Sequence, residues 1–368
     1  MVSADPPTSR PATVSNLVAD DQSVHLSWIE DDDVNPPRLR FATFSDGSWS
    51  EPNTIVESDA LFVNWADFPS LAVLADGSIA AQWLVREEGA SFSYGFRFSV
   101  SADRGVTWSP PVRPASSDAS AQYGFVSLVP RVSGAVEIVW LDGRDLSGES
   151  GRMSLRHRRW HEGTLGEESI IDDDVCTCCQ TAAVTAGETV IVAYRDHAAG
   201  EIRDIGTARL TREGWQPPRT LHADGWEIGG CPVNGPALDA LGNRVAVAWH
   251  TEAGESPRVM AAFSDDAGRT FSDPVRLDAG KPLGRVDVKM TPDGFAVVSW
   301  LETDGDEAEV RLSLFRPDGS IEALPSPGRT GGGRSSGFPR TALLDERLYV
   351  TWTETGESSR VRVASIDL

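Results

Sequence analysis

The sequence predicts an all-β fold, a seven-bladed β-propeller of four-stranded antiparallel blades. Three observations carry this prediction: a strand-turn-strand pattern that occurs seven times, an aromatic residue that closes each copy, and almost no helical periodicity. Repeats of roughly 40–50 residues that contain several short strands are typical of propellers. A propeller with six blades is the alternative.

The closing aromatics recur every 51 to 57 residues. Apolar runs such as residues 79–85 and 244–249 end in or contain one of them and read as strands. The full set consists of Trp28, Trp83, Trp140, Tyr194, Trp249, Trp300 and Trp352.

The last repeat, from Arg340 to Leu368, supplies only three strands. We expect the N-terminal segment, for example Arg10–Val14, to add the missing outer strand, because an open sheet edge is a liability. A closed array of repeats is one domain whatever its length, so residues 1–368 are predicted to form a single β-propeller domain, with the last blade closed by the N-terminal segment.

The charge excludes several classes of partner. Asp and Glu number 55 against 33 Lys and Arg, a net charge of -22, which repels nucleic acids and anionic membranes. No apolar run approaches the roughly 18 residues that span a bilayer. The start, Met1–Pro7, is typical of a chain that follows a removed leader, so we expect a periplasmic or secreted monomer whose partner is a small-molecule or metal ligand.

Two turns share the pattern Ser-x-Asp-x-Gly-x-Thr-aromatic, at residues 101–108 and 264–271, and residues 45–49 hold a degenerate copy. The Asp side chain can bond amides of its own turn, and the Gly supplies a positive φ. These motifs resemble the Asp-box (BNR) repeats of the sialidase superfamily. The resemblance covers nearly the whole chain as architecture, but it says little about the reaction.

Aligned on the closing aromatics, the repeats bring all four cysteines to one rim, at the starts of first strands. Cys176 and Cys231 each stand 18 residues before their aromatic, and Cys178 and Cys179 follow the first of them. The same alignment brings His197 and His250 to this rim, and it sets Cys178 opposite Asp196.

The cysteines allow a metal site, a disulfide framework or a set of free thiols, and the alignment favours the metal. Blades pack about 10 Å apart, whereas a disulfide needs Cα atoms within roughly 4.4–6.8 Å. On an extended strand Cys176 and Cys178 face one side and Cys179 the other. We therefore expect Cys176, Cys178 and Cys231 to bind copper, or less favourably zinc, completed by His197 or His250.

The resemblance implies a second set of residues. A sialidase binds its substrate carboxylate with three arginines and uses a tyrosine nucleophile and an acidic Asp. The matching positions on the rim are Asp67, Tyr123, Arg195, Arg285 and Arg340. The chain departs from the family at Asp67-Phe68-Pro69-Ser70, where sialidases carry Phe-Arg-Ile-Pro. The three arginines could instead form ion pairs with Asp196, Asp287 and Glu354.

The leading functional hypothesis is therefore an exported propeller with a Cys/His metal site, in a metal-handling or redox role. The first alternative is a sialidase-like glycoside hydrolase or glycan-binding propeller. The second is an interaction scaffold stapled by disulfides. The residues do not decide whether the protein is an enzyme.

Overall fold

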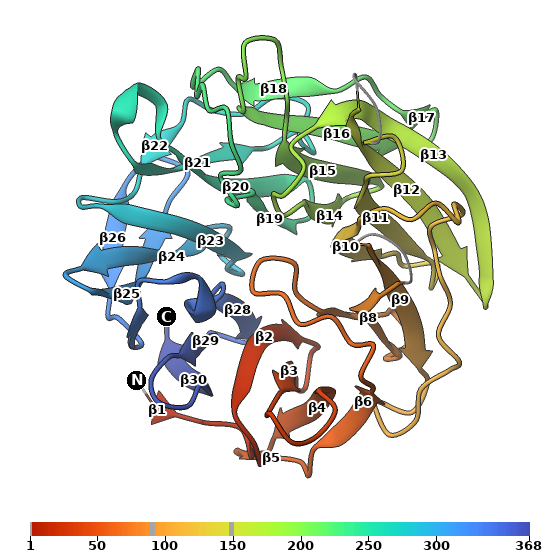
Figure 1. The fold of residues 1–368 in the computed structure, drawn as a ribbon. Helices are drawn as coiled ribbons and strands as arrows, with labels where there is room; N and C mark the ends of the chain where they lie inside the picture. The colour runs from red at the N-terminus through yellow and green to blue at the C-terminus, as the bar shows by residue number, and fades with distance from the viewer. Residues whose placement is uncertain (1, 88–92, 147–150) are drawn as a thin grey trace. The chain divides into compact units, whose positions relative to one another are not determined.

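The computed structural model describes residues 2–87, 93–146 and 151–368, and within these ranges it contains seven antiparallel sheets (Figure 1). The fold is the all-β, seven-bladed propeller that the sequence predicts, and the six-bladed alternative is wrong. Two short 3-10 helices, η1 (Ala253–Glu255) and η2 (Arg334–Ser336), lie in loops. Among these residues no helix is long and apolar enough to cross a bilayer.

In every sheet three consecutive strands pair in chain order, and in six of the seven sheets all strands are consecutive, whereas the seventh also takes in β1. Short strands at the outer position share the third strand as their partner in three of the sheets. The first sheet contains β2 (Ala12–Ala19), β3 (Val24–Glu30), β4 (Arg38–Ser45), β5 (Ser48–Trp49) and β6 (Asn53–Glu57). The second contains β7 (Ser70–Val73), β8 (Ile79–Arg86) and β9 (Tyr94–Ser101). The third contains β10 (Tyr123–Pro130), β11 (Val136–Asp142), β12 (Met153–His161) and β13 (Thr164–Val175).

The remaining sheets follow the same plan. The fourth contains β14 (Ala182–Ala186), β15 (Thr189–Arg195), β16 (Ile205–Thr211), β17 (Gly214–Trp215) and β18 (Arg219–His222). The fifth contains β19 (Ala237–Leu241), β20 (Arg244–Thr251), β21 (Arg258–Ser264) and β22 (Val275–Arg276). The sixth contains β23 (Pro282–Met290), β24 (Ala296–Asp304), β25 (Glu307–Phe315), β26 (Ile321–Leu324) and β27 (Arg329–Gly331). The seventh contains β28 (Arg340–Leu344), β29 (Arg347–Glu354), β30 (Arg360–Asp367) and β1 (Val2–Ser3).

The seven closing aromatics all lie in the second strand of their sheet, and none is more than 5% exposed. Their large apolar surfaces explain why this position is the most regular feature of the repeat. Burying one such side chain contributes about 1.5–3 kcal/mol. The second strands are consequently the most completely buried, as in β3 and β11, where every residue is buried.

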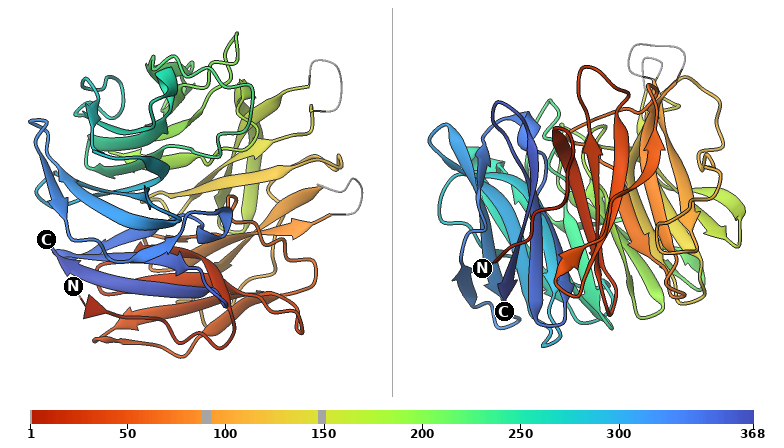
Figure 2. Two further views of the ribbon diagram at one scale, coloured as in Figure 1. Left: turned by 60° about the vertical axis from the view of Figure 1, so that its left-hand side comes forward. Right: turned by 90° about the horizontal axis from the view of Figure 1, so that it is seen from below.

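The N-terminal segment completes the last sheet, as predicted, but through different residues. Val2 and Ser3 pair with Ser365 and Ala364 of β30, so the two ends of the chain lie side by side (Figure 2). The expected segment around Arg10–Val14 instead leads into β2, the first strand of the first sheet. The chain is therefore closed by residues nearer the terminus than the repeat pattern suggests.

The chain divides into two compact units. The first comprises Met1–Ile138, Arg158–Glu168 and Gly333–Leu368, and the second comprises Val139–His157 and Ser169–Gly332. In the first unit, apolar side chains from the seventh and first sheets form one core cluster, exemplified by Leu26 and Val363. In the second unit, the fifth and sixth sheets share a cluster that includes Val259 and Trp300.

The two Asp-box turns have the local hydrogen bonds that the sequence predicts. In the first, Asp103 Oδ1 accepts from the Thr107 amide at 2.8 Å, Oδ2 accepts from the Thr107 hydroxyl at 2.6 Å, and Gly105 has φ of 89°. Bonds from the Thr107 side chain and amide lower the pKa of Asp103 to about 2. The second turn repeats this arrangement with Asp266 and Thr270. These turns fix the outer part of their sheets.

Candidate functional site

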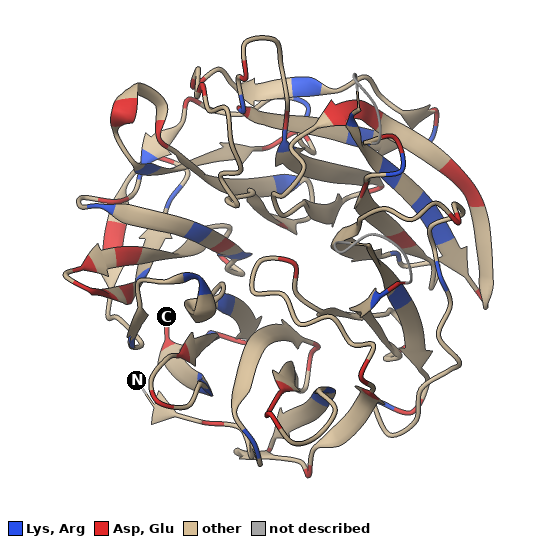
Figure 3. Ribbon diagram, viewed as in Figure 1, with Lys and Arg blue, Asp and Glu red and all other residues tan. Residues whose placement is uncertain are grey.

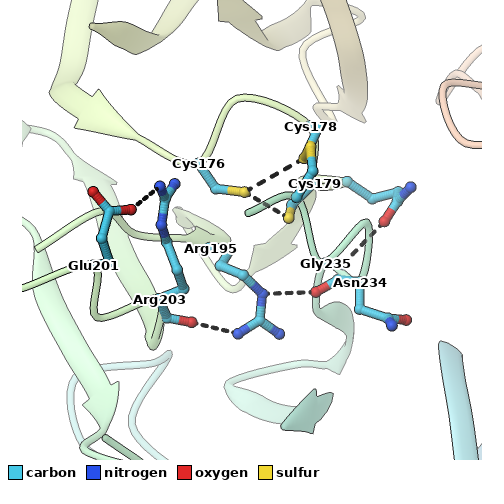
Figure 4. The surroundings of a disulfide bond; sticks show 10 residues. Cys176, Cys178, Cys179, Arg195, Glu201, Arg203, Asn234 and Gly235 are labelled. Carbon is cyan, nitrogen blue, oxygen red and sulfur yellow. Dashed lines mark hydrogen bonds and ion pairs between the residues drawn. A yellow bond between two sulfur atoms is a disulfide. The ribbon is translucent and has the colours of Figure 1, made fainter. Parts of the chain in front are cut away.

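The sequence prediction that the four cysteines meet is confirmed (Figure 4). Three of them lie in the segment between β13 and β14, and Cys231 lies in the segment between β18 and β19. Cys176 and Cys231 each stand six residues before a first strand, which begins at Ala182 or Ala237. The repeat therefore brings equivalent segments of neighbouring sheets together in the second unit.

The sulfur atoms fall into two pairs. Cys178 and Cys231 form a disulfide with their Cα atoms 6.1 Å apart, which is within the usual range. Cys176 Sγ lies 2.7 Å from Cys179 Sγ and 4.0 Å from Cys178 Sγ. The sulfurs of Cys176, Cys178 and Cys179 all lie within 4.8 Å of one another. The disulfide thus uses Cys178 and Cys231, two of the three sulfurs expected to share a metal ion.

Cys179 does not face away from the other cysteines, and this corrects the expectation from an extended strand. The strand β13 ends at Val175, and a turn at Thr177 and Cys178 follows. A turn brings residues three apart to the same side, so Cys176 and Cys179 become partners. The expected pairing of Cys178 with Asp196 is also wrong, because Asp196 bridges to Val175.

Cys176 is the thiol that ionises first. A hydrogen bond from the Cys179 thiol lowers the pKa of Cys176 to about 7 against the effect of burial, helped by the charges of Arg195 and Arg203. Burial raises the pKa of Cys179 well above its usual value, and the neighbouring Cys176 adds to the increase. The pair therefore holds one negative charge near neutral pH, and a thiolate is the form that acts as nucleophile or metal ligand.

Arg195 holds this region together and is not free to bind a substrate. Its guanidinium donates to three backbone carbonyls: to Asn234 at 2.8 Å, to His250 at 2.7 Å and to Arg203. The guanidinium also lies 4.6 Å from the centre of the Trp226 ring, and the residue is 1% exposed. The predicted role of Arg195 in a three-arginine carboxylate site is therefore corrected to a structural one.

We predict that Arg195→Met lowers the free energy of unfolding by on the order of 3–5 kcal/mol, because it leaves three buried carbonyls without donors. Chemical denaturation measures the loss. The matched control is Arg212→Met, since Arg212 has an 83% exposed side chain and only a surface ion pair with Glu188. That variant is expected to lose less than about 1 kcal/mol. Equal losses in the two variants would contradict the structural role of Arg195.

The two predicted histidine ligands have other contacts. His197 Nδ1 lies 2.7 Å from Asp174 and its Nε2 lies 3.4 Å from Glu201. His250 is fully buried, with Nε2 3.1 Å from Glu252 and its ring edge against Trp226. Over the described ranges, the only group of three or more potential ligand residues whose ligand atoms all lie within 4.8 Å of one another is formed by Cys176, Cys178 and Cys179, and it contains neither histidine.

The predicted acid Asp67 lies in the first unit and is 1% exposed. Its Oδ1 accepts a hydrogen bond of 2.7 Å from the Phe125 amide. The Tyr94 hydroxyl lies near the carboxyl of Asp67 and stabilises its charged form. The buried Oδ2 of Asp67 still has no full hydrogen-bond partner among the described residues. Burial nevertheless raises the pKa of Asp67 to about 7. Gly124 makes room for the carboxyl, since a Cβ there would collide with it.

Aromatic side chains lie beside Asp67 in the sequence and in space. The Trp65 ring stacks on Phe338 with centroids 6.1 Å apart, and Phe68 lies 5.4 Å from Phe338. The guanidinium of Arg340 lies 5.2 Å from the centre of the Phe68 ring. Phe68, the chain neighbour of Asp67, therefore contacts both Phe338 and the guanidinium of Arg340 within the first unit.

The surroundings of Tyr123 and Arg285 suit a catalytic role less well than those of Asp67. Tyr123 is fully buried, and its hydroxyl donates to the Ala119 carbonyl at 2.9 Å, which does not suit the role of nucleophile. Arg285 lies in the second unit with a φ of 59°, and its amide donates to Asn234 Oδ1 at 2.8 Å. Burial lowers the pKa of Arg285 to about 10.

Sequence reasoning missed Tyr94, Phe338 and Asn234. Tyr94 stands at the start of β9, a third strand, whereas the alignment considered the starts of first strands. Phe338 precedes β28 by two residues, and the sequence shows it only as an aromatic residue in a loop. Asn234 joins Arg195, Arg285 and Leu283 through its carbonyl and its side chain. An asparagine in a loop gives no such signal.

No family model and no curated protein matches this chain. Several solved structures do. An ulvan lyase, described as a new family of polysaccharide lyase, has a TM-score of 0.63 and 11% identity, covering 100% of this chain and 95% of its own. An α-L-arabinofuranosidase from Fusarium graminearum has a TM-score of 0.57 and 13% identity, covering 100% and 98%. An α-L-arabinanase from Penicillium chrysogenum has a TM-score of 0.58 and 13% identity, with the same coverage. This chain therefore shares its β-propeller fold with solved enzymes that act on glycans.

Proposed function

We propose that this protein is an exported enzyme that cleaves glycosidic bonds, with Asp67 as the proton donor. The observation that carries the proposal is the buried Asp67 carboxyl, whose pKa of about 7 leaves a large share of it protonated near neutral pH. General acids work best when their pKa is close to the working pH. The likeness of the fold to glycan-cleaving enzymes supports the same function.

The neighbouring groups suit a sugar substrate. The half-buried Trp65, stacked on the buried Phe338, offers apolar ring surface for the face of a sugar ring, and the half-buried Arg340 offers a cation for a carboxylate or hydroxyl. When the glycosidic C–O bond breaks, the leaving oxygen takes the proton of Asp67, a water adds to the anomeric carbon, and the proton that this water loses passes to the solvent. The Phe125 amide and Tyr94 then stabilise the Asp67 carboxylate that remains.

Incubation with a panel of polysaccharides tests this proposal. We expect new reducing ends with neutral or uronate-containing chains, measured by a reducing-sugar assay with parallel detection of unsaturated uronate products. An activated sialoside is expected to be turned over feebly or not at all, because Arg195 is engaged by backbone carbonyls. Robust sialoside hydrolysis, or no cleavage of any chain in a broad panel, would contradict the proposal.

Metal binding by the cysteines is the second candidate function. The three sulfurs within 4.8 Å of one another favour it, with Cys231 as a fourth donor once the disulfide is reduced. Soft thiolates select Cu(I) before Zn²⁺. We retain copper as the proposed metal and a redox or metal-handling role as its consequence. The disulfide itself supports a periplasmic or secreted location, since such bonds persist in oxidising compartments.

A further inference from the structure

A groove of about 710 Å³ lies in the second unit, beside the outer strands of the fourth sheet. Its walls come from β16, β18 and the loop that joins them, and from the Asp-box turn at residues 268–271. This volume lies within the range of about 300–1,000 Å³ of small-molecule sites. The groove contains none of the cysteines and none of the residues proposed to cleave glycans.

The lining carries four arginines and only two glutamates. Arg212 pairs with Glu188 at 2.6 Å. Arg209 is half-buried, and its Nε donates to the Ala267 carbonyl at 2.8 Å, which fixes the guanidinium in place. In the part of the chain that the structure describes, Arg219 and Arg269 have no carboxylate partner within ion-pair distance. A surplus of positive charge is therefore held in one groove.

These arginines are close enough to repel one another. Burial lowers the pKa of Arg209, and the charges of Arg269 and Arg219 lower it further, while Asp266 acts in the opposite direction. Asp266 is itself engaged by Thr270 and Ser264 within its turn. A bound anion would therefore offset the repulsion between these arginines, which the nearby Asp266 carboxylate offsets only in part.

The first Asp-box turn offers an internal comparison. There Arg104 lines a groove of about 490 Å³ in the first unit, and it pairs with Asp20 at 2.6 Å. In the second turn Ala267 takes the place of Arg104, and the arginine of that turn, Arg269, follows the glycine and lacks such a partner among the described residues. The chain has a net charge of -22, and its two signs of charge are spread over strands and loops (Figure 3).

We propose that this groove binds a short anionic oligosaccharide, with Arg209, Arg219 and Arg269 holding its carboxylate or sulfate groups. The planar fork of a guanidinium matches both oxyanions. Uncharged hydroxyl and amide groups also line the groove, including Thr189, Thr220 and Gln216, and these suit sugar hydroxyls. A nucleic acid would extend its phosphates beyond the groove onto a surface whose net charge repels them.

Titration calorimetry on the full chain tests the proposal. The probes are a sulfated disaccharide, a uronate tetrasaccharide, the neutral counterpart of each, inorganic sulfate and a DNA oligonucleotide. We expect the sulfated or the uronate sugar to bind, its neutral counterpart to bind at least about tenfold more weakly, and added salt to weaken the binding. Inorganic sulfate and DNA are expected to bind more weakly than the charged sugar.

The double variant Arg219→Gln/Arg269→Gln is expected to bind the charged sugar at least about tenfold more weakly, because two charge-assisted hydrogen-bonding groups are lost. The matched control Arg104→Gln should bind like the wild type, and so should Asp67→Asn. Unchanged binding by the double variant with an unchanged melting temperature would overturn the proposal. Equal binding of the neutral sugars, or tighter binding of DNA or inorganic sulfate, would also overturn it. Binding that survives Asp67→Asn separates this groove from the proposed site of cleavage.

Discussion

Asp67→Asn is expected to reduce glycan cleavage by about 100- to 10,000-fold, the usual contribution of a general acid. The amide keeps the shape of the carboxyl, and its oxygen can still accept the Phe125 N–H, but it has no proton to donate. The reducing-sugar assay on the substrate found in the polysaccharide panel measures the effect. In the wild type, cleavage should fall as the pH rises above about 7, where Asp67 loses its proton.

The same substitution is expected to stabilise the protein at alkaline pH. The pKa of Asp67 is about 7 in the folded protein and 3.8 as the ordinary value, so the folded state binds the proton more tightly. The stability that this group contributes is therefore complete below pH 3.8 and is lost as the pH rises through 7. With about 1.4 kcal/mol per pKa unit, the loss is on the order of 4 kcal/mol, and Asn avoids it.

Denaturation of wild type and Asp67→Asn at pH 4 and pH 8 measures this difference. The advantage of the variant should grow with pH. Asp103→Asn is a control of opposite sign, because the pKa of Asp103 is lowered to about 2 by its Asp-box hydrogen bonds. That variant should be less stable than the wild type at pH 8. If Asp67→Asn retains full activity, or if its advantage shrinks with pH, Asp67 is not the proposed acid.

The number of blades could be predicted because the sequence repeats its largest apolar residues at one position of each sheet. Trp28, Trp140 and Trp249 are fully buried, and their spacing reflects the constant length of one sheet plus its loops. The same regularity placed Cys176 and Cys231 in equivalent segments. The sequence did not indicate which short segment closes the seventh sheet, because only two residues, Val2 and Ser3, take part in the pairing.

Side-chain pairing within the site was predictable only in part, because it depends on the local backbone. An extended segment at Cys176 would have separated Cys179 from the other sulfurs, whereas the observed turn reverses this arrangement. The repeat alignment placed the charged Arg195 on the rim predicted to hold the site. Nothing in the sequence indicated that its guanidinium donates hydrogen bonds to three backbone carbonyls. Asp67 was identified by its position, while its raised pKa follows from its burial against Gly124 and Phe125 of β10, which only the fold determines.

Cysteine substitutions are expected to fall into two classes that follow the two sulfur pairs. Cys178→Ser and Cys231→Ser should each lower the free energy of unfolding by about 4 kcal/mol, because the disulfide closes a loop between residues 53 apart. The double variant should lose no more than either single variant, since one bond is broken in all three. Denaturation of the oxidised protein measures these losses, and a thiol titration should find one additional free thiol in each single variant.

Cys176→Ser and Cys179→Ser are expected to act on reactivity and metal rather than on this loop. Cys176→Ser removes the thiolate that forms near pH 7, so the thiolate absorbance that appears near that pH should disappear. Cys179→Ser keeps a hydroxyl donor beside Cys176 but removes a soft sulfur. If these two sulfurs bind copper, either substitution should release most of it, whereas a serine at Cys178 or Cys231 should leave a larger share bound. Metal analysis of all four variants, alongside their melting temperatures, separates the outcomes. If all four variants lost the same stability and the wild type contained no metal, the copper site would be excluded. The same result would contradict the division into two sulfur pairs, because equal losses would mean that all four cysteines contribute to one covalent framework.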